Sequence, residues 1–124
     1  MILLFLSADD ILNADDLQRE AVEVPEWGGS VLVQGMSGTE RDRFEASMLN
    51  KNMNGVDKDK AMERYRARLA AACLVDQDGK RLFRSEAETR RLGEKSAQAL
   101  TRVVEVASRL SGLSDDDVEE LTGN

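Results

Sequence analysis

Hydrophobic residues in the stretch 22–45 change from one spacing to another, and the change predicts two kinds of structure in a row. On both sides of Gly28 and Gly29, apolar residues occupy every second position, as is typical of strands: Val22, Val24, Val31 and Val33. Ser37, followed three residues later by Glu40, forms a capping-box pattern. The stretch therefore predicts a β-hairpin that is followed directly by a helix.

Two longer segments, 58–75 and 96–110, repeat apolar residues at the 3.6-residue spacing of a helix. The residues expected to face inward are Ala61, Met62, Tyr65, Leu69, Ala72 and Cys73 in the first segment, and Ala99, Leu100, Val103, Val106, Ala107 and Leu110 in the second. Because both apolar stripes are wide enough to bury, we predict that the two helices pack together. Leu69 and Val103 should then be shielded from solvent.

Shorter patterns flank these segments. Ser7 is a candidate N-cap for a short helix that ends near Arg19, with Ile11, Leu12 and Leu17 facing inward. The first turn of this helix is acidic, which is favourable at the positive end of a helix dipole.

Two further patterns lie in the second half of the chain. The Asp-Gly pair at 78–79 stands between two apolar pairs and predicts a second hairpin. Ser114 precedes three aspartates and predicts a last short helix, with Val118 and Leu121 facing inward.

Length and composition place these elements in one unit. The chain has 124 residues, of which 41% are hydrophobic and 33% are charged, as in an ordinary globular domain. We therefore predict a single domain, residues 1–124, with an α+β fold that is predominantly α-helical. The expected architecture is a small bundle of about five to six helices with one or two short β-hairpins.

Charge is distributed unevenly along the chain, whose net charge is −7. Residues 58–91 hold 10 bases and 6 acids, a net charge of +4, whereas the remainder holds 7 bases and 18 acids, a net charge of −11. The acidic balance argues against a nucleic-acid binder, which needs a basic face. A positive middle between negative ends suits head-to-tail contacts between copies or an acidic partner. The alternative is that these charges are only solvated helix faces.

The first residues, MILLFLS, are apolar, but we do not expect them to form a signal peptide or a membrane span. They lack a basic segment and a cleavage site, and the apolar run is too short to cross a bilayer. We expect residues 1–6 to form an apolar N-terminal arm that packs on the core or on a partner, and we expect no membrane association.

Candidate chemistry is sparse. The chain has no histidine, so the commonest general base and metal ligand is missing. Cys73 is the only cysteine, and it lies on the apolar face of the predicted helix 58–75, as a buried hydrophobic residue would. We therefore predict no enzymatic activity, no metal and no cofactor.

Several motifs, taken in order, resemble one family. They are SADDIL at 7–12, VEVPEWGG at 22–29, GMSGTERDRF at 35–44, CLVDQDGKRLF at 73–83, LGEKSAQAL at 92–100 and VEVASRLSGL at 104–113. This order resembles the tail assembly chaperones of long-tailed bacteriophages and prophages, in their short form.

The resemblance implies a protein that binds the tape measure protein, keeps it soluble and helps to recruit subunits of the major tail tube protein. It also implies action in the host bacterial cytoplasm and absence from the mature virion. The uneven charge of the chain separately predicts weak, salt-sensitive self-association, as a ring or a spiral. The alternatives are a structural minor tail or head–tail component that stays in the virion, and a small regulatory or antitoxin-like protein.

Partner contacts are expected at apolar side chains that the domain does not need for its own core. The candidates are Ile2, Leu3, Leu4, Phe5, Trp27, Leu113, Val118 and Leu121. Trp27 stands at the predicted hairpin tip, where it serves either as a partner anchor or as a lid on the core. For Val118 and Leu121 the alternative is that they complete the core.

Overall fold

The structure, a computed structural model, describes residues 4–52 and 58–122. Within these residues the chain forms six helices, a three-stranded sheet and one 3-10 turn. In chain order they are α1 (Ala8–Leu12), β1 (Arg19–Val24), η1 (Pro25–Trp27), β2 (Gly29–Gln34), α2 (Gly38–Asn52), α3 (Lys58–Cys73), β3 (Leu74–Val75), α4 (Glu86–Gly93), α5 (Ala97–Leu110) and α6 (Asp115–Leu121). The predicted α+β, mainly helical fold is confirmed.

The sheet is antiparallel, in the order β1-β2-β3. β1 pairs with β2 along its whole length, and Gly28, with φ of 82°, provides the left-handed residue that the connection needs. The hairpin predicted from the alternating valines is thus confirmed. The second predicted hairpin is much smaller: β3 pairs with β2, and a single bridge joins Val75 to Arg81 around Gly79.

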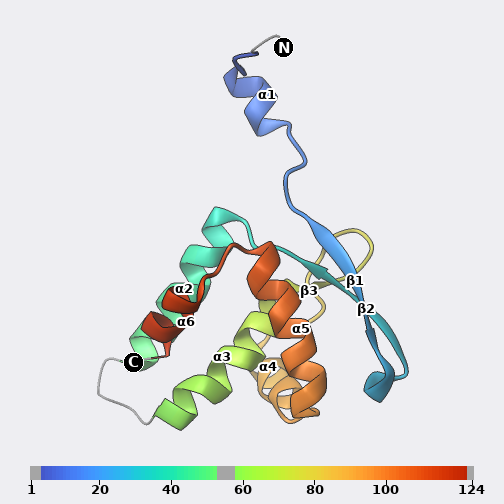
Figure 1. Ribbon diagram of the computed structural model, residues 1–124, viewed down its shortest axis with the longest axis vertical. Coiled ribbons are helices and arrows are strands. Elements are labelled where there is room, and N and C mark those ends of the chain that lie inside the picture. Colours follow the sequence, from blue (N-terminus) through green and yellow to red (C-terminus); the bar gives the residue numbers. More distant parts are fainter. Residues whose placement is uncertain (1–3, 53–57, 123–124) are drawn as a thin grey trace.

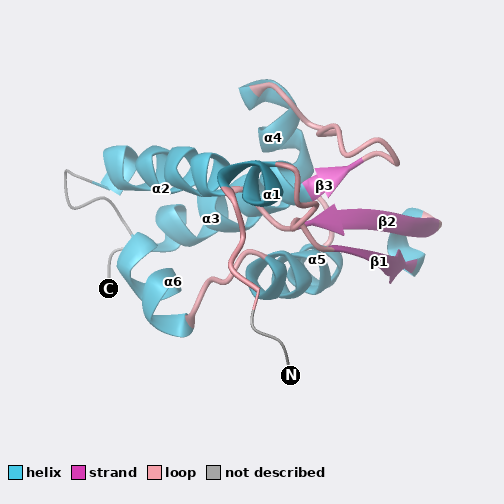
Figure 2. Cartoon of the chain, turned by 90° about the horizontal axis from the view of Figure 1, so that it is seen from above, coloured by secondary structure: helices cyan, strands magenta, loops and turns pink. Residues whose placement is uncertain are grey.

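The core lies between α3, α5 and the inner face of the sheet. α3 packs against α5, which also packs against β1 and β2 (Figure 2). Leu69 and Val103 are fully buried, as predicted. Ala61 and Met62 lie outside the residues whose side chains the structure describes. The largest fully buried side chains are Met48, Leu69, Leu74, Val24, Val33, Val103 and Cys73.

The junction between β2 and α2 is pressed against the end of α5. The amide of Met36 donates to the Ser111 hydroxyl at 3.0 Å, and a Cβ on Gly35 would collide with the backbone carbonyl of Leu110. The predicted capping box is present: the Glu40 amide donates to Ser37 Oγ, and the Ser37 amide donates to Glu40 Oε1. Glycine is therefore needed at 35 for a close approach of two backbones.

The first helix differs from the sequence prediction. α1 ends at Leu12, and Arg19 already begins β1, so the predicted helix to Arg19 is too long. Ile11 and Leu12, which we expected to face inward, are 59% and 80% exposed, so that prediction is wrong. Figure 1 shows the reason: residues 13–18 lead away from the body and hold α1 beyond the reach of the core. Leu17 alone is half-buried.

Candidate partner-binding surfaces

The N-terminal extension, residues 4–18, presents apolar side chains to solvent. Leu4, Phe5 and Leu6 are 78%, 87% and 65% exposed. With Ile11 and Leu12 they include most of the large exposed hydrophobic side chains of the described residues. Contiguous exposed apolar side chains of this kind mark interaction sites on soluble proteins. Two other predicted contact residues, Ile2 and Leu3, lie outside the described residues.

Local hydrogen bonds hold α1 in helical form although it has few neighbours. Ser7 caps the helix: the Asp10 amide donates to Ser7 Oγ at 3.1 Å, and the Ser7 amide donates to Asp10 Oδ2 at 2.9 Å. The Ser7 amide, followed by the Ser7 hydroxyl, stabilises the ionised carboxylate of Asp10 and so lowers its pKa. The extension therefore carries a preformed acidic turn next to its apolar residues.

Trp27 lies at the tip of the β1–β2 hairpin and is half-buried. Its ring packs against the core cluster. A two-pronged ion pair fastens the tip to α5, since Arg102 donates to both Glu26 carboxylate oxygens at 2.8 and 2.9 Å. The hydrogen bonds from Arg102 hold the pKa of Glu26 at about 2. Trp27 thus closes one end of the core, and only part of its ring is open to a partner.

The C-terminal candidates pack against the body. Leu121 is 4% exposed and belongs to the core, while Leu113 and Val118 are partly buried against it. Arg41 of α2 holds this segment in place, because its guanidinium contacts Asp117 Oδ2 at 3.3 Å and the Gly112 carbonyl at 3.4 Å. The C-terminal segment therefore helps to complete the core, as the alternative interpretation of Val118 and Leu121 has it.

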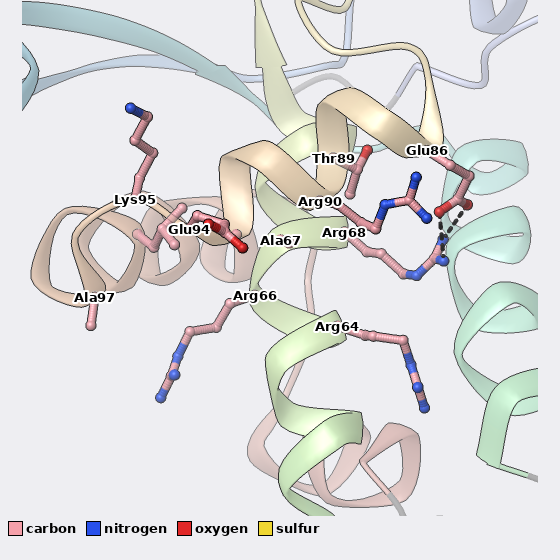
Figure 3. A pocket seen from close by; sticks show the side chains of 12 residues that line it. Arg64, Arg66, Ala67, Arg68, Glu86, Thr89, Arg90, Glu94, Lys95 and Ala97 are labelled. Carbon is pink, nitrogen blue, oxygen red and sulfur yellow. Dashed lines mark hydrogen bonds and ion pairs between the residues drawn. The ribbon is translucent and has the colours of Figure 1, made fainter.

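A groove between α3, α4 and the start of α5 was not predicted from the sequence. It has a volume of about 530 Å³, and its lining includes five cations, two acids and three apolar residues: Arg64, Arg66, Arg68, Arg90, Lys95, Glu86, Glu94, Ala67, Ala97 and Leu100. Figure 3 shows Arg66 and Lys95 on one side of the groove and Arg68, Arg90 and Glu86 on the other. The net positive segment 58–91 was the signal in the sequence, but the spacing alone did not show which bases converge.

The two acids do not cancel the charge of this basic groove. Glu86 accepts from both terminal nitrogens of Arg68, at 3.0 and 3.1 Å. Glu94 is the second acid in the lining. For the cations Arg66, Arg90 and Lys95, the structure gives no ion pair within the described residues. The floor is apolar because Ala67 and Leu100 are buried there. A groove with a cationic rim and an apolar floor fits an acidic, amphipathic polypeptide segment.

The remaining chemistry of the described residues is limited. Cys73 is buried, and burial raises the pKa of its thiol to about 11. No cluster of three or more candidate metal-ligating side chains occurs within residues 4–52 and 58–122. In the same residues, no helix is both long and apolar enough to span a membrane.

The family is shown by comparison of the sequence with known families. The model of the phage tail assembly chaperone family matches residues 11–123. The chain belongs to this family. The resemblance drawn from the six motifs is thus confirmed, and the family is generally non-enzymatic. The exposed residues Leu4, Phe5 and Leu6 precede the matched part.

A solved structure supports the same fold. The solved structure of the tail assembly chaperone of bacteriophage HK97 matches this chain with a TM-score of 0.57 and 24% sequence identity. The match covers 76% of this chain and 85% of that chain. At this identity the likeness concerns the fold alone. No curated protein matches the sequence.

Proposed function

We propose that this tail assembly chaperone binds the tape measure protein, keeps that long polypeptide soluble and helps to recruit tail tube subunits around it. It acts in the host cytoplasm and is absent from the finished virion. The observation that carries the proposal is the exposure of Leu4 and Phe5, which are 78% and 87% open to solvent. Figure 1 shows that the N-terminal extension to which they belong stands away from the body.

The physical case rests on shielding apolar surface. A long helical client exposes apolar stripes, and covering them is worth roughly 25 cal/mol per Å² before ordering costs are subtracted. Modest contacts repeated by several copies along one client would therefore suffice. The net charge of −7 keeps such a complex soluble.

The contact residues fall into two groups. Leu4 and Phe5, together with the preceding Ile2 and Leu3, form the main contact in this proposal. Trp27, Leu113 and Val118 contribute only their exposed parts, and Leu121 supports the body from within the core.

Copies of the chaperone also associate with one another in this proposal. Surfaces of opposite sign on one chain give a contact that repeats head to tail, as a ring or a spiral, and that weakens as salt screens it. Several copies can thereby cover a long client.

Co-expression with the tape measure protein of the same phage tests client binding. The client should be soluble with the wild-type chaperone and should aggregate when Leu4 and Phe5 are both changed to Asp. Leu82→Asp is the control for adding an aspartate at an exposed apolar position, since Leu82 is exposed on the body, outside the extension. A client that stays equally soluble alone, or with the doubly substituted chaperone, would contradict the proposal.

Mass spectrometry of purified virions tests the second part. The chaperone should be missing, at a sensitivity that detects minor tail proteins of known copy number. Its presence in stoichiometric amounts would favour the structural tail component that the sequence left open.

A further inference from the structure

We infer that α1 of one copy docks into the basic groove of a second copy. This inference rests on the self-association proposed above and names the two surfaces that form the contact. It assigns different tasks to two parts of the extension: α1 joins copies, while Leu4 and Phe5 remain for the client.

The first argument is charge complementarity. Residues 4–18 contain four acids and no lysine or arginine: Asp9, Asp10, Asp15 and Asp16. The basic groove carries five cations and two acids, one of which is joined to Arg68. Opposite charges on two surfaces steer them together and fix their orientation.

The second argument is the match of apolar surface. Ile11 and Leu12 are exposed next to the acids, and the core of their own chain is complete without them. The groove offers an apolar floor at Ala67, Ala97 and Leu100. Its volume of about 530 Å³ suits a few side chains from one helical turn, not a long helix.

The third argument is position. In Figure 1, α1 lies at one end of the molecule, and α4, which forms one wall of the groove, lies at the other end. A contact between two different surfaces at opposite ends is heterologous, so each added copy again presents one unused α1 and one unused groove. The result is a repeating row of copies and not a two-fold dimer.

Complementation between two variants tests this contact. In the first variant, Ile11 and Leu12 are both changed to Asp, which disables α1. In the second, Arg66 and Lys95 are both changed to Glu, which disables the groove. Each variant alone should self-associate at least about tenfold more weakly than wild type in sedimentation velocity at low salt. Mixed together, they should form a heterodimer and nothing larger, because one intact α1 and one intact groove remain.

Two controls keep the result specific. Arg43→Glu with Lys80→Glu makes the same change of net charge on exposed residues outside the groove, and this variant should associate like wild type. Circular dichroism should show that every variant is folded, since all the substituted side chains lie outside the buried core.

Several outcomes would overturn the inference: a monomeric wild type at high concentration and low salt, a mixture without heterodimer, or variants that associate like wild type. If the α1 variant loses only client solubilisation while it still self-associates, α1 binds the client and the inference fails although the proposed function stands. If complementation succeeds but the client stays soluble without chaperone, the proposed function fails while the inference stands.

Discussion

α1 and α6 have nearly the same local sequence pattern, but their apolar residues differ in burial. Each begins with a serine cap followed by aspartates, each forms a complete capping box, and each is a short helix with apolar residues near its end. Yet Leu12 is mostly exposed, whereas Leu121 is buried in the core. The comparison teaches that a capping box fixes where a helix begins and leaves its packing undecided.

The difference comes from the neighbours of each helix. α6 follows α5 after the left-handed Gly112, and Arg41 of α2 contacts Asp117 of α6. α1 is joined to β1 by residues 13–18, which lead away from the body (Figure 1). Leu121 of α6 is thereby buried in the core, whereas Ile11 and Leu12 of α1 remain exposed.

The largest expected effect separates the two leucines. Leu121→Ala removes buried methyl groups and should lower the free energy of unfolding by about 2–5 kcal/mol. Leu12→Ala changes an exposed side chain and should change it by less than about 0.5 kcal/mol. Urea unfolding followed by circular dichroism measures both. Equal losses for the two variants would show that α1 packs on the body in solution.

Removal of the two serine caps should also affect global stability differently, but by a smaller amount. Ser114→Ala removes the acceptor for the Asp117 amide and should cost about 1 kcal/mol of global stability. Ser7→Ala removes the equivalent acceptor for the Asp10 amide, yet the midpoint of global unfolding should stay unchanged because α1 is not coupled to the core. Hydrogen exchange at residues 9–12 should nevertheless accelerate. A shift of the midpoint by Ser7→Ala would contradict the separation of the two helices.

The smallest effect is on the acid sensitivity of the fold. The backbone amide of Ser114, followed by the Ser114 hydroxyl and by Arg41, lowers the pKa of Asp117 from 3.8. Because the folded pKa lies below the unfolded one, Asp117 stabilises the fold above pH 3.8, and this contribution is lost as the pH falls through the lower folded pKa.

Asp10 provides the matched comparison for this titration. Its pKa is lowered in the same way, chiefly by the backbone amide of Ser7. Asp117→Asn should therefore flatten the decline of global stability at acid pH, whereas Asp10→Asn should leave it unchanged. Thermal unfolding between pH 2 and pH 5 records both curves, and identical effects of the two variants would contradict the comparison.

The groove illustrates how far the sequence could lead toward a site. The positive balance of residues 58–91 was visible in the sequence, and it indicated an acidic partner or another copy. The sequence did not show that Lys95, beyond this segment, joins Arg66 at one side of the groove, or that Glu86 is joined to Arg68. Those facts depend on how α4 packs across α3.

The sequence by itself determined the elements whose cause is local or periodic. Alternating valines specified the first hairpin, serine caps specified the starts of short helices, and apolar stripes at 3.6-residue spacing specified α3 and α5 with Leu69 and Val103 inside. These features depend on backbone hydrogen bonding and on the repeat of each element, both of which are written in adjacent residues.

Only the tertiary structure decided which apolar residues remain outside. Ile11 and Leu12 have the pattern of a core face, and Leu121 was a candidate contact, but Leu121 belongs to the buried core cluster, whereas Ile11 and Leu12 remain exposed. A close-packed core has room for a limited set of side chains, and the connectivity of the chain decides which of them can reach it. Which apolar residues are buried therefore depends on segments that are distant in the sequence, and it cannot be predicted from adjacent residues alone.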